Sequence, residues 1–282
     1  MIKAYLIIDE SGAKGYSKNT EQTEGEFGVM VGYLVPFDAL CILKEQSTQS
    51  FKTISSKDKI HITDLTEESQ MYKAREILYT NFKHQKACWF YNAIYVNGLN
   101  NAYKNFDNKE LLHVELFKGV FFKAIACIYD TTKSKDIYIE VISDTIDRSV
   151  IKKFKESIDE LINLYTNKDL IKSSTRYDKS TKKVINYSHT TTVKYDDSMI
   201  LFNSIKYDIK CEDTAITFLS DILANSVNYY LKKSIKENMN IELNSIDAIK
   251  KHPLSNLVYG CTKKDSNYTI DIMDIMYRRV YK

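Results

Sequence analysis

The stretch from Ala4 to Gly12, AYLIIDESG, constrains the fold more than any other part of the chain. Its first five residues form an apolar run rich in residues that favour strands, and Ser11-Gly12 is typical of a turn. A continuous apolar run indicates a strand that is covered on both faces. We therefore predict a central strand that ends at Asp9 and Glu10.

These two acids have two interpretations. In an open α/β sheet, ligand-binding and catalytic groups gather at the carboxyl ends of the strands, which is where Asp9 and Glu10 stand. Acidic residues are also favoured in turns because their side chains bond to the local backbone. The stretch alone favours the turn interpretation, so other parts of the sequence are needed to choose.

Strand-like and helix-like segments alternate along the chain, which predicts an α/β fold with a mixed central sheet flanked by helices. Predicted strands cover residues 4–10, 27–35, 87–96, 136–143 and 199–211, with a short extended segment at 58–65. Predicted helices cover residues 37–45, 67–82, 108–129, 147–165 and 214–233. The first two strands are close enough in sequence to pair as antiparallel neighbours.

No linker composition divides the chain, which has only two prolines and eight glycines in 282 residues. We predict one domain at residues 1–235, with a polar insertion at 167–197. A C-terminal extension at residues 236–282, holding short helices, is expected to pack on the same domain. The sequence leaves the oligomeric state and any protein partners open.

The composition limits the partners and the compartment. Forty basic residues against thirty-seven acidic ones give a net charge of +3, too balanced to require a nucleic-acid partner. The apolar stretches are far shorter than the ~20 residues of a membrane span, and Met1 leads into a strand rather than a signal-peptide pattern. The five cysteines are widely spaced and form no CxxC pair, so neither a disulfide framework nor a zinc site is indicated. We expect a soluble cytoplasmic protein with no membrane contact and with reduced, mostly buried thiols.

One carboxylate stands out in the predicted helix 214–233. From residue 214 to residue 231, Asp221 is the single charged side chain, and it shares a helix face with Thr217, Asn225 and Asn228. A solvated stripe is the alternative, but in this Lys- and Glu-rich chain such a stripe would be expected to contain more charged residues. We predict that the helix packs against the strand ends and presents Asp221 inward.

Three acids thus come from two strand ends and one helix, because Asp144 directly follows the predicted strand 136–143 and joins Asp9 and Asp221. Carboxylate oxygens are the ligands that Mg²⁺ or Mn²⁺ prefers. In a two-metal site such ions stabilise the attacking and leaving oxygens of a phosphoryl displacement. This combination favours a nuclease.

Five segments carry a resemblance to a known family: IIDESG, FGVMVGYLV, IHITDL, VISD and CEDTAITFLSDILANSV. Together they resemble the domain of unknown function 3800 family, which is understood as ribonuclease H-like in fold. The resemblance runs from Met1 to about Lys233 and leaves the tail uncovered. It implies a Mg²⁺- or Mn²⁺-dependent phosphodiesterase that acts on nucleic acid, and at family level a role in defence against phage.

The resemblance also implies roles for individual residues. Asp9 would be the first-strand metal ligand, Asp144 the mid-chain ligand and Asp221 the final-helix ligand, with Glu10 as an added ligand or base. Two departures from the family pattern put the binding of two metal ions in question, because a fourth acidic ligand is missing. Lys59 stands where an acid is usual, with Asp58 just before it, and FLSDILAN replaces the more usual Gln-x-Ala-Asp. The alternative is a non-catalytic nucleic-acid- or protein-binding module with a degenerate ribonuclease H-like site.

The histidines and the basic insertion are the remaining signals. His61, with Asp64, could assist as a proton-transfer or phosphate-facing group, although a lone histidine in a strand is more often structural. His84, His113, His189 and His252 lack metal-ligand spacing and are interpreted as structural. In the insertion, basic residues including Lys182 and Lys183 are interleaved with Tyr177, Tyr187 and Tyr195. This pattern is that of a nucleic-acid grip or, alternatively, of a solvated loop.

Overall fold

The computed structural model describes residues 1–13, 25–55, 61–96, 98–99, 110–166, 170–178, 180–191, 200–237, 245–260, 262–265 and 268–271. Its centre is a five-stranded sheet with the strand order β3-β2-β1-β4-β7. The strands are β1 (Ile2–Gly12), β2 (Phe27–Pro36), β3 (Trp89–Tyr95), β4 (Asp136–Ser143) and β7 (Ser204–Cys211). β1, β2 and β3 pair antiparallel, whereas β4 runs parallel to β1 and β7 parallel to β4. The predicted α/β fold with a mixed sheet is confirmed.

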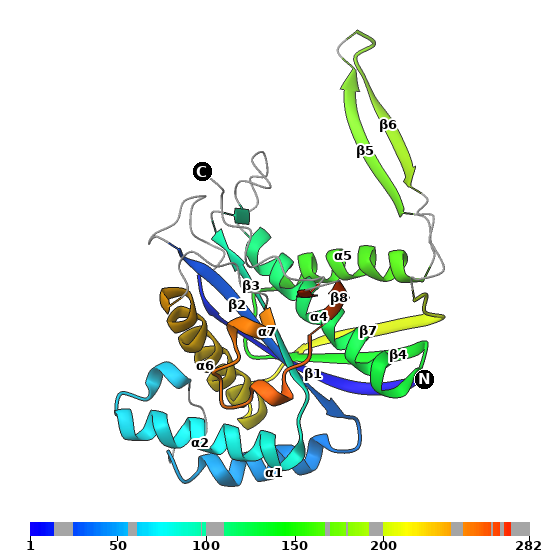
Figure 1. The fold of residues 1–282 in the computed structure, drawn as a ribbon. Helices are drawn as coiled ribbons and strands as arrows, with labels where there is room; N and C mark the ends of the chain where they lie inside the picture. Colours follow the sequence, from blue (N-terminus) through cyan, green and yellow to red (C-terminus); the bar gives the residue numbers. More distant parts are fainter. Residues whose placement is uncertain are drawn as a thin grey trace.

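Helices cover both faces of the sheet (Figure 1). One face carries α1 (Leu40–Phe51), α2 (Glu68–Gln85) and α6 (Ala215–Glu237), and the other carries α4 (Leu111–Thr132) and α5 (Arg148–Tyr165). Along β1, Ile7 belongs to the core under α6, while Leu6 and Ile8 belong to the core under α4 and α5. The apolar run is therefore buried on both faces, as predicted.

Several boundaries differ from the sequence prediction. β1 does not stop at Asp9 and Glu10 but continues to Gly12, because its last residues pair with β2. α1 occupies residues 40–51 rather than 37–45, and β7 begins at Ser204 rather than at 199. In the segment predicted as extended, residues 62–64 form a 3₁₀ turn, η1 (Ile62–Asp64), while 58–60 lie outside the described residues. These boundaries depend on pairing and packing partners that are distant in sequence.

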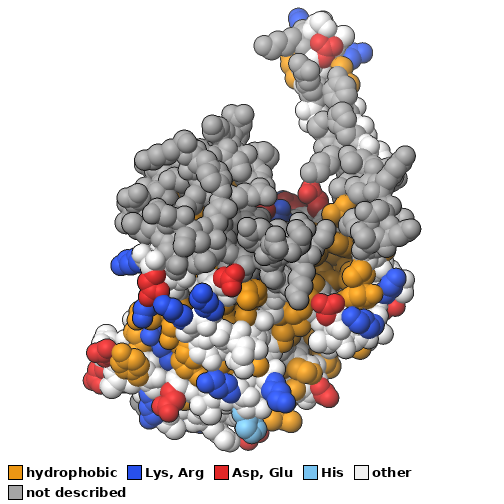
Figure 2. Space-filling model, in the orientation of Figure 1, with side chains coloured by type: hydrophobic (Ala, Val, Ile, Leu, Met, Phe, Trp, Pro, Cys, Tyr) orange, Lys and Arg blue, Asp and Glu red, His pale blue; other side chains and the backbone are white. Residues whose placement is uncertain are grey.

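The polar insertion predicted at residues 167–197 contains a β-hairpin. β5 (Leu170–Asp178) pairs antiparallel with β6 (Lys183–Thr191), and the hairpin projects away from the body of the protein (Figure 1). The chain segments that enter and leave the insertion meet at its base, where Phe202 N donates a hydrogen bond to Tyr165 O at 2.9 Å. Because β7 runs parallel to β4, this base lies at the edge of the sheet where β1 and β4 begin. Charged side chains gather at the hairpin tip (Figure 2), where Lys182 and Lys183 are exposed.

Residues 245–260 of the C-terminal extension pack on β3 and α6. They contain α7 (Ser245–Ala248) and the 3₁₀ turn η2 (Ser255–Leu257). Trp89 Nε1 donates to Leu254 O at 3.0 Å, and Tyr259 N donates to Trp89 O at 2.7 Å. Two further strands, β8 (Thr262–Asp265) and β9 (Tyr268–Asp271), pair with each other and were not expected from the sequence. In the described part of the chain, no helix is both long and apolar enough to cross a membrane.

The thiols are less buried than expected. Cys127 is buried and Cys88 half-buried, but Cys41 and Cys211 are exposed, so the prediction of mostly buried thiols is wrong for the latter two. Cys41 lies on the outer side of α1, and Cys211 is the last residue of the edge strand β7. Cys261 lies outside the described residues.

A buried histidine anchors the C-terminal extension. His252 is 2 % exposed, its Nδ1 accepts a hydrogen bond from Leu254 N at 3.1 Å, and its Nε2 lies 2.9 Å from Ser226 Oγ. Because Nδ1 accepts, the neutral ring carries its proton on Nε2 and donates it to Ser226. Burial, followed by the positive charge of Arg75, lowers the pKa of His252 to about 3. The structural role predicted for this histidine agrees with these contacts.

The stability of the fold should therefore fall in mild acid through His252. The unfolded chain takes up a proton near the ordinary pKa of 6.5 while the folded protein does not, so stability is lost as the pH falls from 6.5 toward 3. Between pH 7 and pH 5 the advantage of the wild type over His252→Asn in free energy of unfolding should shrink by about 2 kcal/mol. Urea denaturation at both pH values measures it, with the exposed His84→Asn as control. An advantage that stays constant over this range would contradict the assignment.

Candidate functional site

The parallel pairing of β1 with β4 brings two acids to one edge of the sheet. The register aligns Ile7 with Ile142, and both side chains belong to the core under α6. Asp9 and Asp144 each follow two residues later, so the alternation of side chains directs both toward the same face. Because the strands are parallel, their carboxyl ends lie at the same edge.

Asp9 is the most buried of the site carboxylates. The residue is 7 % exposed, and its Oδ1 accepts a hydrogen bond from Glu10 N at 2.6 Å. Burial raises the pKa of Asp9 well above its ordinary value, and the negative charges of Asp221, Asp144 and Glu10 raise it further. Asp144, directly after β4, is half-buried. Its charge thus acts on Asp9 from the neighbouring strand.

Helix α6 supplies the third carboxylate. Ser220 Oγ donates to Ile8 O at 3.3 Å, and Asn228 Nδ2 donates to Ser11 Oγ at 3.0 Å, which holds α6 along the end of β1. Asp221 follows Ser220 and its side chain is 17 % exposed. Its Oδ2 accepts a hydrogen bond from Ile62 N at 2.7 Å, so the carboxylate faces η1 and the strand ends.

The pKa of Asp221 is raised to about 6. Burial is the main cause, and the negative charges of Asp144 and Asp64 add to it, while the Ile62 N–H and His61 act in the opposite direction. Asp9, Asp144 and Asp221 therefore form an electrostatically linked group at one edge of the sheet. Of the predicted metal ligands, all three are brought to this edge.

The donor chemistry of this group fits a hard divalent cation, but the side chains do not form a closed ligand set. Carboxylate oxygens suit Mg²⁺ or Mn²⁺, and no lysine or arginine of the described residues forms an ion pair with Asp9 or Asp221. Within the same residues, however, no group of three or more His, Cys, Asp or Glu side chains is arranged to hold an ion. An ion bound through one or two carboxylates and water is the coordination that Mg²⁺ commonly adopts.

Glu10 is not brought to the face of the other acids. Its Oε2 lies 3.1 Å from Nε2 of His113, a residue of α4 that is 7 % exposed. As the residue after Asp9, Glu10 points to the opposite face of the sheet. The alternation of side chains along a strand is the sequence signal that predicts opposite faces for Asp9 and Glu10.

His61 is close to the site, whereas Asp64 shapes the turn. His61 Nδ1 lies 3.8 Å from Asp221 Oδ2, and its side chain is 42 % exposed. Asp64 Oδ2 accepts a hydrogen bond from His61 N at 3.0 Å and is itself exposed. Asp58 and Lys59 lie outside the described residues.

Of the residues predicted to bind nucleic acid, Lys182 lies in the turn of the hairpin and Lys183 is the first residue of β6. The base of the hairpin is at the sheet edge opposite the carboxylates. A different basic residue, Arg75, stands nearer to them. Arg75 Nη2 donates to Asn225 Oδ1 at 2.9 Å, and Asn225 lies one helical turn beyond Asp221. The guanidinium also lies over the ring of Tyr229, 5.2 Å from its centroid. Sequence reasoning missed Arg75, since nothing local links it to α6.

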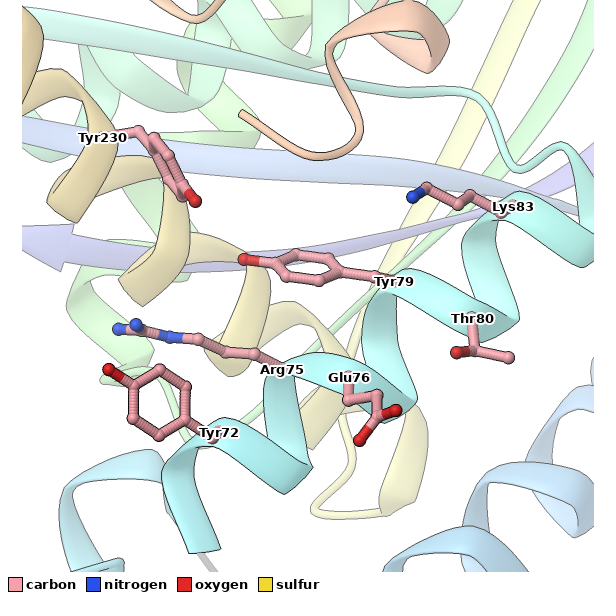
Figure 3. Close-up of a pocket in the computed structure, with 7 residues that line it drawn as sticks. All are labelled: Tyr72, Arg75, Glu76, Tyr79, Thr80, Lys83 and Tyr230. Atoms are coloured by element: carbon pink, nitrogen blue, oxygen red, sulfur yellow. The ribbon is translucent and has the colours of Figure 1, made fainter. Parts of the chain in front are cut away.

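Arg75 belongs to a cavity of about 470 Å³ between α2 and α6 (Figure 3). The hydroxyls of Tyr79 and Tyr230 point toward each other across it, while Glu76 points away. Tyr79 OH is hydrogen-bonded to Ser226 Oγ at 2.7 Å, which connects this wall to the buried His252. The cavity thus combines two cations, Arg75 and Lys83, with the rings of three tyrosines.

No family model and no curated protein matches the sequence, so the geometry of the site carries the functional assignment.

Removing the charge of Asp221 should stabilise the folded protein at neutral and alkaline pH. A folded pKa of about 6 against an ordinary 3.8 means that ionisation opposes folding as the pH rises through this window. In EDTA at pH 8, Asp221→Asn should gain up to roughly 3 kcal/mol over the wild type, and the gain should vanish near pH 4. Asn keeps an oxygen to accept the Ile62 N–H.

Thermal unfolding across pH 4 to 8 measures this effect, with Asp136→Asn at the opposite end of β4 as the control that should show no gain. An Asp221→Asn protein that melts below the wild type at pH 8 would contradict this prediction, because it would show that the folded protein stabilises the ionised Asp221 carboxylate.

Proposed function

We propose that this protein is a divalent-metal-dependent nuclease that hydrolyses phosphodiester bonds of RNA or DNA. The observation that carries the proposal is the convergence of Asp9, Asp144 and Asp221 at one sheet edge, with the pKa of Asp9 and Asp221 raised by burial and by neighbouring acids. Catalytic sites are where buried like charges are assembled at a cost to stability.

The fold supports the same proposal. A mixed five-stranded sheet with helices on both faces is compatible with the ribonuclease H-like fold that the resemblance to the domain of unknown function 3800 family implies. The acids that this resemblance assigns as ligands are those at the carboxyl ends of β1 and β4 and on α6. Neither the family nor the fold decides the substrate, so the chemistry of the site has to.

The residues of the site have separable roles in this proposal. Asp9, Asp144 and Asp221 would hold Mg²⁺ or Mn²⁺, which when bound neutralises phosphate charge and activates water. The Ile62 N–H fixes the orientation of the Asp221 carboxylate. His61, partly exposed beside Asp221, is placed to accept or donate a proton at Nδ1.

The surface next to the carboxylates supports a nucleic-acid strand as substrate. Asn225, which holds Arg75, is about 6 Å along α6 from Asp221, so Arg75 could bind a phosphate neighbouring the reacting one. The exposed rings of Tyr229, 51 % accessible, and Tyr72, 62 % accessible, offer stacking surfaces for bases. Lys182 and Lys183 would be contacts remote from the reaction.

The alternative is a non-catalytic module that binds nucleic acid or protein. It is favoured by one observation: among the described residues, no three candidate ligands form a ready-made ion site. The two functions differ in their dependence on metal, because the nuclease requires a divalent cation and the binding module does not.

Cleavage assays separate the two functions. Labelled single- and double-stranded RNA and DNA should be cleaved with Mg²⁺ or Mn²⁺ and not in EDTA, and Asp9→Asn should reduce the rate by more than about 100-fold. Asp136→Asn, at the start of β4, should cleave like the wild type. Cleavage that persists in EDTA or in Asp9→Asn would rule out the metal mechanism.

Binding assays in EDTA test the strand path. Arg75→Met should weaken the binding of a single-stranded oligonucleotide for all sequences alike and reduce the slope of log K against log salt by roughly 0.7. Lys73→Met, an equal loss of charge on the same helix, is the control that should leave both unchanged. Fluorescence anisotropy measures both, with Lys182→Gln/Lys183→Gln tested in parallel for the hairpin. Equal salt slopes for Arg75→Met and Lys73→Met would exclude Arg75 from the binding surface.

A further inference from the structure

Two cysteines are in direct contact at the edge of the sheet opposite the carboxylates. Cys88 Sγ and Cys127 Sγ lie 2.9 Å apart, although the residues are 39 positions apart in sequence. Cys88 directly precedes β3, and Cys127 lies near the C-terminal end of α4. The contact therefore connects a strand of the sheet to a helix of the covering layer.

The surroundings make this pair reachable from solvent. Both cysteines line a cavity of about 700 Å³ at the start of β1, and Lys3, His84 and Lys86 line the same cavity. Cys88 is half-buried while Cys127 is buried, so a small reagent meets Cys88 first. A partly exposed thiol is open to oxidants from solvent, whereas a fully buried one is not.

The two thiols have different roles in this contact. The hydrogen bond with Cys127 lowers the pKa of Cys88, while the same contact and burial raise the pKa of Cys127. Either thiol can donate in this contact, and Cys88 is the less buried of the two, so we assign the thiolate to Cys88 and the donated hydrogen to Cys127. The Cys88 backbone is held in place because its carbonyl accepts a hydrogen bond from Leu34 N at 3.1 Å.

We propose that Cys88 and Cys127 are a redox modification site that closes to an intramolecular disulfide on reaction with a hydroperoxide. With hydrogen peroxide, the Cys88 thiolate attacks one oxygen, a sulfur–oxygen bond forms, the oxygen–oxygen bond breaks and hydroxide leaves. Hydroxide takes the proton of Cys127, giving water. The Cys127 thiolate then attacks the Cys88 sulfur, expelling a second hydroxide that is protonated to water. Two thiols lose two electrons, and one peroxide becomes two waters.

The disulfide would fasten β3 to α4 and close a loop of about 40 residues, which constrains the unfolded chain and raises stability. The site is separate from Asp9 and Asp221, so it does not rest on the proposed nuclease activity. Its expected effect is a melting temperature a few degrees higher in the oxidised protein.

The experiment uses the full chain with Cys41, Cys211 and Cys261 replaced by Ser. The protein is treated with hydrogen peroxide, its free thiols are blocked with N-ethylmaleimide, and its mass is measured. The expected product has lost two hydrogens, carries no maleimide, contains a dithiothreitol-sensitive peptide joining Cys88 to Cys127, and melts above the reduced protein. Two maleimide adducts after treatment, sulfinic acids in place of the disulfide, or an oxidised form that melts no higher would overturn the proposal.

Single variants of the same protein test the order of attack. Cys127→Ser should leave a sulfenic acid at Cys88 that dimedone traps, whereas Cys88→Ser should leave Cys127 unmodified. The reverse pattern would contradict the assigned roles. If either variant does not fold, the mass of the parent protein alone decides whether the disulfide forms.

Discussion

The parallel pairing of β1 with β4 is the constraint on which the candidate site depends. Its register sets Ile7 beside Ile142, and the same alternation of side chains carries Asp9 and Asp144 to one face and one edge. Packing of α6 along the end of β1 then adds Asp221. A shift of one residue in the pairing would turn Asp9 or Asp144 to the opposite face.

Gathering acids at a buried edge opposes folding. Burial raises the pKa of Asp9 and Asp221, and the negative charges of other acids raise it further. Few groups act in the opposite direction. The Glu10 N–H does so on Asp9, and the Ile62 N–H and His61 do so on Asp221. A chain rich in Lys could have placed an ammonium group here, yet Lys44, Lys153 and Lys210 form ion pairs with other acids. The divalent cation that we propose would relieve this repulsion.

Local sequence pattern predicted much of this arrangement and missed the parts that depend on distant contacts. The apolar run before Asp9 and the neutral stripe around Asp221 were enough to place both acids in a packed environment. Side chains alternate between the two faces along a strand, so the sequence alone could also have predicted that Glu10 and Asp9 point to opposite faces. The bond between Arg75 and Asn225, 150 residues apart, has no counterpart in local pattern, and neither does the contact of Cys88 with Cys127. The place of the hairpin followed from topology: β7 begins at the edge opposite the carboxylates because it runs parallel to β4.

The central claim is that this edge of the sheet binds a divalent cation through its carboxylates. The most direct measurement is the anomalous difference density of a crystal soaked in Mn²⁺. The account predicts a peak at about 2.0–2.2 Å from carboxylate oxygens of Asp9 and Asp221, with Asp144 as a further ligand directly or through water. A crystal that shows no peak at this edge, with the Asp221 carboxylate still bonded to Ile62 N and remote from any ion, would contradict it.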